Sequence, residues 1–327
     1  MEAQLITIGP DGEFRTIQEG LDAKKGELSP LVFFLQPGVY REKLYIDHPD
    51  VTIRGDSEDT TSIVYGDSAS SLCGGVPMGT FASATVTVSA PGFRAEHITI
   101  ANDFDYPMHR KESDRDFGKI TGLQAVALRT TGFSDCVYLS HCRFLGYQDT
   151  LFLDHGSHQI DSCTIEGLVD FIFGSGSCLF LHCLVVSRGK GYICAPSTKS
   201  GDLGFLFYCC RFVCADTGVP LSSVYLGRPW HPKADPSLVP CAVLVDCFLD
   251  GHICFEGWTS MHANCADGSQ IEFTPSQSKF FESHSYGPGS VASPIPPRVS
   301  IAKEQLPSVL GLQSPYWISL CKRLKVF

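Results

Sequence analysis

The chain has 327 residues, of which 43% are hydrophobic and 18% are charged, and its formal net charge is −10. This composition is typical of a globular, sheet-rich protein with a large buried core, and its charge argues against nucleic acid and anionic membranes as partners. No apolar stretch is long enough to span a bilayer, and no basic, apolar leader precedes Leu5. We therefore expect a cytoplasmic protein, or a secreted one if a leader has been removed.

The first helical pattern covers residues 14–23, where apolar residues recur at helical spacing. Thr16 and Glu19 have the spacing of a capping box, which predicts that a short helix begins after Thr16. From Leu31 onward, short apolar runs alternate with glycines, which indicates strands and tight turns. The helix is therefore expected to cap one end of a β-rich fold.

A weak five-residue repeat recurs through most of the chain. Each copy begins with an apolar residue and has another two positions later; the copies begin at Val51, Ile98, Cys142, Cys163, Cys183, Cys210 and Cys247. Periods near 20 residues that lengthen irregularly are typical of a solenoid. We predict an all-β fold, a right-handed parallel β-helix, because a β-sandwich gives no reason for seven aligned copies. The cysteines should form a ladder of packed thiols.

The segments between and after the repeats bear on domain organisation. Residues 103–121 carry mixed charge without an alternating apolar pattern, which predicts a mobile lip. The repeats fade beyond Gly257, and the glycines and prolines that follow indicate a tail, about residues 287–327, that packs over the coils. Because no linker divides the chain, we expect one domain over residues 1–327. We also expect a monomeric protein.

The fifteen cysteines raise the question of disulfides or of a metal. Without a leader, reduced thiols are expected. A zinc site built from Cys209, Cys210 and Cys214, with or without His182, lacks any paired C-x-x-C spacing, so packed core thiols explain these positions better. No glycine-rich nucleotide loop joins a strand to a helix. We therefore expect no metal and no cofactor.

Two aspartates in apolar, β-prone segments are the candidate catalytic groups. Asp149 lies in GYQDTL (Gly146 to Leu151) and Asp170 in VDFIFG (Val169 to Gly174), 21 residues further on. If one coil takes 21 residues, the two carboxylates lie on neighbouring coils, about 5 Å apart along the stack. In a partly desolvated place one of them ionises easily and the other keeps its proton. This predicts a nucleophile beside a general acid.

Asp170 needs a compensating cation, because its neighbours are apolar. Arg228 is the best candidate, since it precedes a proline and is always charged. A bound guanidinium would hold Asp170 ionised as a nucleophile; the alternative is a buried salt bridge that only joins two coils. Gln124 and Gln148 are either satisfied core amides or donors that stabilise an oxyanion.

The aromatic residues and histidines near these motifs indicate a function less specifically. Trp230 and Trp258 are expected to flank the same face, where a tryptophan near carboxylates suits stacking on sugar rings, although packing is its more common role. His155 and His158 follow the first motif in a turn, and no G-x-S-x-G elbow accompanies them. The histidines therefore offer no competing hydrolase site.

Six motifs in this order point to a known family. They are GVYRE from Gly38, QAVALR from Gln124, GYQDTL from Gly146, VDFIFG from Val169, LGRPW from Leu226 and YGPG from Tyr286. On these motifs the chain resembles the pectin methylesterases (pectinesterases) from about Ile6 or Ile8 to Val299. The family fold is a right-handed parallel β-helix, which agrees with the repeat.

The resemblance implies an enzyme, a carboxylic ester hydrolase without a cofactor. Its implied substrate is methyl-esterified homogalacturonan (pectin) or methylated oligogalacturonides, from whose galacturonate units it releases methanol. Asp170 is implied as the nucleophile, Asp149 as the general acid and later base, Gln124 and Gln148 as oxyanion donors, and Arg228 as the partner of Asp170. The residues implied to contact the sugar chain are Thr80, Tyr147, Phe171, Trp230 and Trp258.

One departure from the family pattern concerns the outer sugar subsites. Many members carry a second tryptophan three residues after the position that matches Trp258, and this chain has Met261 there. Together with the negative charge, this departure favours short methylated oligogalacturonides as substrates.

Other functions of a β-helix fit the sequence less well. A lyase would need an acidic calcium cluster and a free basic residue, and a glycosidase would need paired carboxylates without the glutamines. A non-catalytic pectin-binding β-helix would keep the tryptophans but would not need Asp149, Asp170 and Arg228 together.

Overall fold

The chain divides into two compact units, an N-terminal unit of residues 1–167 and a C-terminal unit of residues 168–327. The predicted single domain over residues 1–327 stays a prediction. Within the described residues, no helix has the length and apolar character needed to cross a membrane. The computed structural model describes residues 3–113, 121–215, 218–292, 295–310, 314–323 and 326.

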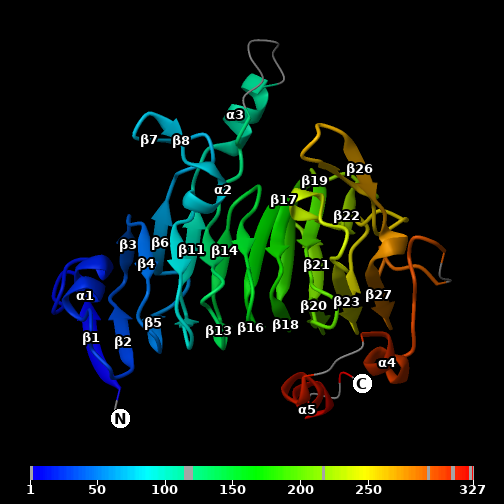
Figure 1. The fold of residues 1–327 in the computed structure, drawn as a ribbon. Helices are drawn as coiled ribbons and strands as arrows, with labels where there is room; N and C mark the ends of the chain where they lie inside the picture. Colours follow the sequence, from blue (N-terminus) through cyan, green and yellow to red (C-terminus); the bar gives the residue numbers. More distant parts are fainter. Residues whose placement is uncertain are drawn as a thin grey trace. The chain divides into compact units, whose positions relative to one another are not determined.

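The N-terminal unit contains three ladders of short parallel strands (Figure 1). The first ladder consists of β1 (Gln4–Ile8), β2 (Leu31–Leu35), β5 (Val51–Gly55), β10 (Arg94–Glu96), β13 (Val137–Ser140) and β16 (Ser157–Asp161). The second consists of β3 (Gly38–Tyr40), β6 (Thr61–Tyr65), β11 (Thr99–Asn102), β14 (Arg143–Leu145) and the start of β17 (Thr164–Gly174). The third consists of β4 (Leu44–Ile46), β9 (Val86–Val88), β12 (Leu128–Thr130) and β15 (Leu151–Phe152).

The C-terminal unit repeats the same plan. Its first ladder consists of β18 (Ser177–Leu181), β20 (Phe205–Tyr208), β23 (Cys241–Val245) and β27 (Lys279–Ser283). The second joins the start of β19 (Leu184–Pro196) to β21 (Arg211–Cys214) and β24 (Phe248–Leu249), and the third joins the end of β19 to β22 (Val224–Gly227). Each turn of the chain adds a strand to these parallel ladders, which confirms the predicted parallel β-helix.

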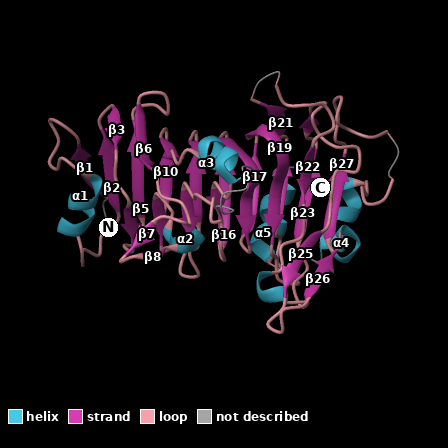
Figure 2. Cartoon of the chain, turned by 90° about the horizontal axis from the view of Figure 1, so that it is seen from above, coloured by secondary structure: helices cyan, strands magenta, loops and turns pink. Residues whose placement is uncertain are grey.

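Few elements lie outside the ladders (Figure 2). In the N-terminal unit they are α1 (Ile17–Ala23), the antiparallel hairpin of β7 (Leu72–Cys73) and β8 (Val76–Pro77), α2 (Gly79–Ala82) and α3 (Tyr106–Ser113). In the C-terminal unit they are the antiparallel hairpin of β25 (Met261–Asn264) and β26 (Gln270–Phe273), α4 (Leu306–Leu310), α5 (Pro315–Arg323) and the short 3₁₀ turns Pro232–Ala234, Pro275–Gln277 and Lys303–Gln305. Within the predicted lip, residues 103–121, α3 forms a helix over Tyr106–Ser113, and residues 114–120 lie outside the described residues.

The N-terminal helix begins where its capping box predicts. The Thr16 hydroxyl accepts a hydrogen bond from the Glu19 backbone N–H at 3.3 Å, and the Thr16 N–H donates to the Glu19 carboxylate at 3.1 Å. Two donors of the first helical turn are thereby satisfied. Ile17, Gly20 and Leu21 are buried, so α1 covers the first coil with its apolar side.

Stacking in register builds the core of each unit. In the first ladder of the N-terminal unit, the fully buried side chains that stack include Phe33, Ile53, Ala95, Leu139 and Ile160. In the C-terminal unit, Leu179, Leu206 and Val243 stack in the same way. A single coil cannot bury its own apolar side chains, so the hydrophobic free energy is gained only when neighbouring coils stack.

Six of the seven predicted repeat copies occupy equivalent strands of the second ladders. The exception is the copy at Val51, which forms β5 in a first ladder, and the prediction for it was wrong. Alternation of buried residues looks alike in every strand that faces the core, so it does not distinguish one ladder from another. A residue with positive φ precedes every copy, including Asp50 before Val51. In the other six copies this residue lies at the corner between the first and second ladders; these residues are His97, His141, Ser162, His182, Cys209 and Asp246.

The tail packs against the C-terminal unit. Leu306 and Leu310 of α4 and Cys321 of α5 are completely buried, in one cluster with Leu206 and Val243 of the first ladder. Before these helices, the buried Arg298 donates from Nε and Nη2 to the two carboxylate oxygens of Glu282, at 2.6 and 2.8 Å.

Candidate active site

Asp170 and Arg228 form a two-point ion pair in the C-terminal unit. Arg228 Nε donates to Asp170 Oδ1 at 2.9 Å, and Nη2 donates to Oδ2 at 2.6 Å. Paired hydrogen bonds of this kind fix the orientation of a carboxylate and are among the stronger polar contacts in proteins. The predicted pairing of these two residues is therefore present in the structure.

The strand next to the ion pair determines where Arg228 lies. The Arg228 N–H donates to the Cys194 carbonyl at 3.0 Å, and the Trp230 N–H donates to the Pro196 carbonyl at 3.0 Å. Both contacts hold the segment after β22 to the end of β19. The guanidinium carbon of Arg228 lies 3.8 Å from the centre of the Tyr192 ring, so a cation–π contact also supports the group.

Asp170 is buried and its backbone is unusual. The residue is 7% exposed and has a φ of 48°, in the left-handed region that non-glycine residues seldom adopt. Burial raises the pKa of its carboxyl above the ordinary value, and the hydrogen bonds and charge of Arg228 oppose that rise. A carboxylate in this position is held in one orientation and is poorly solvated, and two opposing effects act on its pKa. These properties suit a nucleophile.

Gln124, Gln148 and Asp149 belong to the N-terminal unit. The Ala125 N–H donates to the Gln148 carbonyl at 3.0 Å, which places the two glutamines on adjacent coils. Both are partly exposed, and among the described residues no hydrogen bond to another side chain or to backbone occupies either amide group. The amide N–H groups are therefore available to a ligand.

Asp149 has the same backbone conformation as Asp170. Its φ is 64°, and the residue is 9% exposed. Aspartate tolerates this conformation better than most residues, because its short polar side chain can bond locally. Strained backbone of this kind often occurs at functional positions. The sequence gives no direct signal of this backbone conformation. The predicted proximity of the Asp149 and Asp170 carboxylates stays a prediction.

Two predicted sugar contacts in the N-terminal unit are partly exposed. Tyr147 stacks on Tyr106 of α3, with ring centres 5.5 Å apart and an interplanar angle of 8°. Thr80 lies in α2, where its carbonyl accepts hydrogen bonds from the backbone N–H and hydroxyl of Ser83. Both side chains remain accessible to a ligand.

Phe171 and Trp258 require a correction. They are 0% and 1% exposed, so neither ring offers a face to a sugar. The indole of Trp258 stacks on Phe280 at 4.4 Å between ring centres, which explains its burial. An alternative from the sequence, packing in the core, describes the Trp258 side chain better than sugar stacking does.

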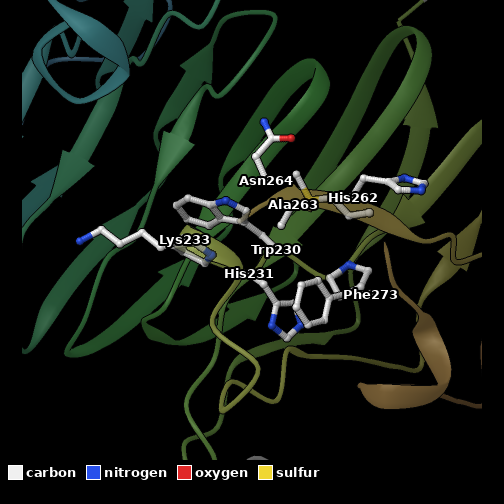
Figure 3. Close-up of a pocket in the computed structure, with 10 residues that line it drawn as sticks. Trp230, His231, Lys233, His262, Ala263, Asn264 and Phe273 are labelled. Carbon is white, nitrogen blue, oxygen red and sulfur yellow. The ribbon is translucent and has the colours of Figure 1, made fainter. Parts of the chain in front are cut away.

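Trp230 lines a cavity of ≈ 170 Å³ in the C-terminal unit (Figure 3). Its indole packs edge-on against Phe173, with ring centres 5.6 Å apart. His231 and Phe273 also line the cavity, and the His231 imidazole stacks on Phe273 with ring centres 3.6 Å apart. The other lining residues are Pro229, Pro232, Lys233, Met261, His262, Ala263 and Asn264.

Tyr192 and Lys233 were not singled out from the sequence. Tyr192 supports Arg228 from a strand 36 residues earlier, and only the coil stacking reveals that contact. Lys233 has a φ of 56° in the proline-rich segment after Trp230, and it is one of the residues that line the cavity. The position of Lys233 three residues after the predicted sugar contact Trp230 was the available signal.

Comparison with known sequences assigns a family. The Pectinesterase family model matches residues 5–293. Pectinesterase A of Dickeya chrysanthemi is 37% identical over 303 residues, which cover 86% of this chain and 82% of that protein. Probable pectinesterase A of Aspergillus niger is 33% identical over 321 residues, which cover 96% of this chain and 87% of that protein.

Solved structures agree with the sequence matches. Pectin methylesterase PemA from Erwinia chrysanthemi superposes with a TM-score of 0.87 at 34% identity, covering 96% of this chain and 99% of that chain. A crystal structure of pectin methylesterase in complex with a hexasaccharide gives a TM-score of 0.87 at 35% identity, covering 95% and 98%. The predicted family, enzyme class and parallel β-helix are thereby confirmed, and the chain belongs to the pectinesterase family.

Proposed function

We propose that this chain hydrolyses the methyl esters of galacturonate units in pectin or in methylated oligogalacturonides and releases methanol. Family membership supports the reaction class, and the hexasaccharide complex of a similar pectin methylesterase supports a sugar-chain substrate. The observation that carries the proposal is the two-point ion pair of Asp170 and Arg228. A buried carboxylate that is held in one orientation is suited to attack an ester carbonyl.

In the first half of the reaction, an ionised oxygen of Asp170 attacks the carbonyl carbon of the ester. The side-chain amides of Gln124 and Gln148 donate hydrogen bonds to the tetrahedral oxyanion, an effect worth roughly 3–4 kcal/mol per donor in other enzymes. The bond to the methoxy oxygen then breaks, and Asp149 donates its proton to that oxygen. Methanol leaves, and an anhydride joins Asp170 to the galacturonate.

In the second half, water hydrolyses the anhydride. Asp149, now ionised, takes a proton from water, and the hydroxide attacks the galacturonyl carbon. Cleavage frees the galacturonic acid and returns Asp170 as a carboxylate, while Asp149 again holds a proton.

Methanol release from methylated oligogalacturonides and from pectin tests the proposal. Wild-type protein should release methanol, whereas Asp170→Asn, which keeps the size of the side chain, should lose several orders of magnitude in kcat. Asp149→Asn should also be severely impaired, because it cannot donate a proton. Asp161→Asn, at the end of β16, is the matched control and should keep wild-type activity.

Two results would overturn this proposal. One is wild-type protein that binds the sugar chain without releasing methanol, which would favour the non-catalytic alternative. The other is an Asp170→Asn variant, with an unchanged unfolding temperature, that keeps more than a small fraction of wild-type turnover.

We also propose that short methylated oligogalacturonides are the working substrate. The net charge of −10 repels long de-esterified chains at low salt, and Met261 lines the cavity beside Trp230 where many relatives are expected to carry tryptophan. The test is kcat/KM per ester group on a methylated trimer to hexamer series and on pectin, at two ionic strengths. A preference for the polymer that salt does not change would contradict the proposal.

A further inference from the structure

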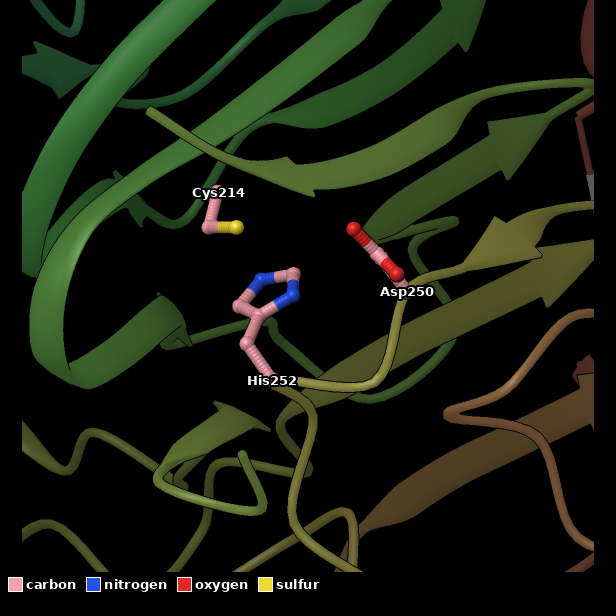
Figure 4. Close-up of side chains that lie close together, drawn as sticks. All are labelled: Cys214, Asp250 and His252. Atoms are coloured by element: carbon pink, nitrogen blue, oxygen red, sulfur yellow. The ribbon is translucent and has the colours of Figure 1, made fainter. Parts of the chain in front are cut away.

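Three side chains with metal-binding chemistry meet in the C-terminal unit, and none of them belongs to the proposed reaction. Cys214 ends β21, and Asp250 and His252 follow β24. One ligand atom from each residue lies within 4.8 Å of the other two. Figure 4 shows the His252 imidazole directed toward the gap between the Cys214 thiol and the Asp250 carboxylate.

The environment of the His252 side chain is independent evidence for a ligand at this cluster. The residue is 2% exposed, and neither ring nitrogen has a hydrogen-bond partner among the described residues. A buried polar group without a partner costs free energy, and most such groups in native proteins bind protein or an ordered ligand. An imidazole with two unpaired nitrogens in this position therefore calls for a ligand.

Ser187 adds a second unpaired group at the same place. It is 1% exposed, and its hydroxyl has no partner among the described residues. Ser187 pairs in register with Cys214 across β19 and β21. Paired residues of parallel strands direct their side chains to the same face of the sheet, so the hydroxyl lies on the side of the cluster.

Backbone hydrogen bonds hold the segments that carry the cluster. The Asp250 N–H donates to the Phe212 carbonyl at 3.0 Å, and the Val224 N–H donates to the His252 carbonyl at 3.0 Å. One carboxylate oxygen of Asp250 accepts from the Gly251 N–H at 2.8 Å, which orients the side chain and leaves its other oxygen for a ligand. The three side chains therefore need little rearrangement to act together.

We propose that Cys214, Asp250 and His252 bind one zinc ion. Thiolate, imidazole and carboxylate are the ligands that zinc takes in proteins, whereas calcium and magnesium prefer oxygen ligands alone. A water molecule fills the fourth position, with the Ser187 hydroxyl as its hydrogen-bond partner. The ion joins the end of β21 to the segment after β24 and stabilises these coils.

This site differs from the zinc site that was weighed from the sequence. That arrangement used Cys214 with Cys209 and Cys210, but the Cys210 thiol instead donates to the Phe180 carbonyl at 3.5 Å. Asp250 and His252 lie 36 and 38 residues after Cys214, so only the stacking of coils brings them to it.

Metal titration of the full chain, freed of metal by chelation and kept reduced, tests the proposal. Calorimetry with Zn²⁺ should show one saturable site, and elemental analysis after gel filtration should give one zinc per chain. With Co²⁺ as the probe, a thiolate-to-metal absorption band should appear. Cys214→Ser should abolish that band and weaken Zn²⁺ binding at least about tenfold, while the melting temperature without metal stays near that of wild type.

The matched control is Cys265→Ser, which removes another half-buried thiol outside the cluster and should leave binding unchanged. If His252→Gln does not fold, Asp250→Asn is the second ligand variant and should also weaken binding. Absence of a saturable site, or equal binding by Cys214→Ser and the control, would overturn the proposal and leave a buried water as the partner of His252. Methanol release does not enter the readout, so failure here is independent of the proposed function.

Discussion

Arg228 contacts Asp170 and Tyr192 with the same guanidinium group. It binds both carboxylate oxygens of Asp170 at 2.9 and 2.6 Å, and its carbon lies 3.8 Å from the centre of the Tyr192 ring. The ring restricts the cation, and the cation in turn orients the carboxylate. Burial raises the pKa of Asp170 and Arg228 opposes the rise, so this contact contributes to the pH at which the proposed nucleophile ionises.

The first prediction concerns that balance. Replacing Arg228 by methionine removes the charge that favours ionised Asp170, so the acid limb of the kcat/KM profile should move to higher pH. Arg228→Lys keeps a charge but loses the two-point contact, so its limb should lie between those of wild type and Arg228→Met. Arg211→Lys, near Phe248, is the control. An acid limb that stays fixed in both variants would show that Asp170 is not the group that titrates.

The second prediction concerns the proposed oxyanion donors. Gln124→Ala and Gln148→Ala should each lower kcat about 10²–10³-fold with a smaller change in KM, because the hydrogen bonds strengthen only as charge develops on the ester oxygen. Steady-state kinetics on one methylated oligogalacturonide measures both constants. Gln159→Ala in β16 is the control. A loss confined to KM would assign the glutamines to substrate binding instead.

The third prediction concerns the stacked thiols. Cys142 and Cys183 donate hydrogen bonds to carbonyls two residues earlier, each at 3.3 Å, and burial raises the pKa of the Cys210 thiol well above its ordinary value. A buried, protonated thiol reacts slowly. In native protein, an alkylating reagent should therefore modify the exposed Cys73 and Cys136 first.

Mass spectrometry after alkylation in denaturant without reductant should then count fifteen modified thiols. A stable set of disulfides would contradict the expected reduced state. It would also count against the cytoplasmic location, which stays a prediction.

Local and periodic features were the ones that the sequence predicted well. The capping box of Thr16 and Glu19 depends on residues three apart, so no tertiary information was needed. The stacked cysteines followed from a repeat whose period matches one coil. The copy at Val51 was misplaced, because alternating burial marks any strand that faces the core.

Features that depend on which segments pack together were beyond the sequence. Trp258 is buried because Phe280 of β27 covers it, and a tryptophan near polar motifs looks the same whether it is covered or exposed. Tyr192 contacts Arg228, and Cys214 lies close to His252. Both contacts depend on the exact lengths of the intervening loops. Because the coils differ in length, no fixed spacing in the sequence predicts such contacts.

The last prediction concerns stability and pH. His158 is completely buried, and its Nε2 lies 3.1 Å from the Thr130 hydroxyl. Burial lowers the pKa of its imidazole from 6.5 to about 4, although the carboxylates of Asp135 and Asp154 favour the charged form. The folded protein therefore holds this histidine neutral at pH values where the unfolded chain is protonated.

The sign follows from proton binding. Between pH 6.5 and about 4 the unfolded chain binds more protons at this residue than the folded protein does, so the free energy of unfolding should fall as the pH falls through that window. The full difference is worth about 3 kcal/mol. His158→Gln keeps a polar partner for Thr130 and should remove most of this dependence. Urea unfolding at pH 7 and pH 4.5 measures it, with His262→Gln, on an exposed histidine, as the control. If His158→Gln lost as much stability as wild type between the two pH values, a different group would be responsible for the acid sensitivity.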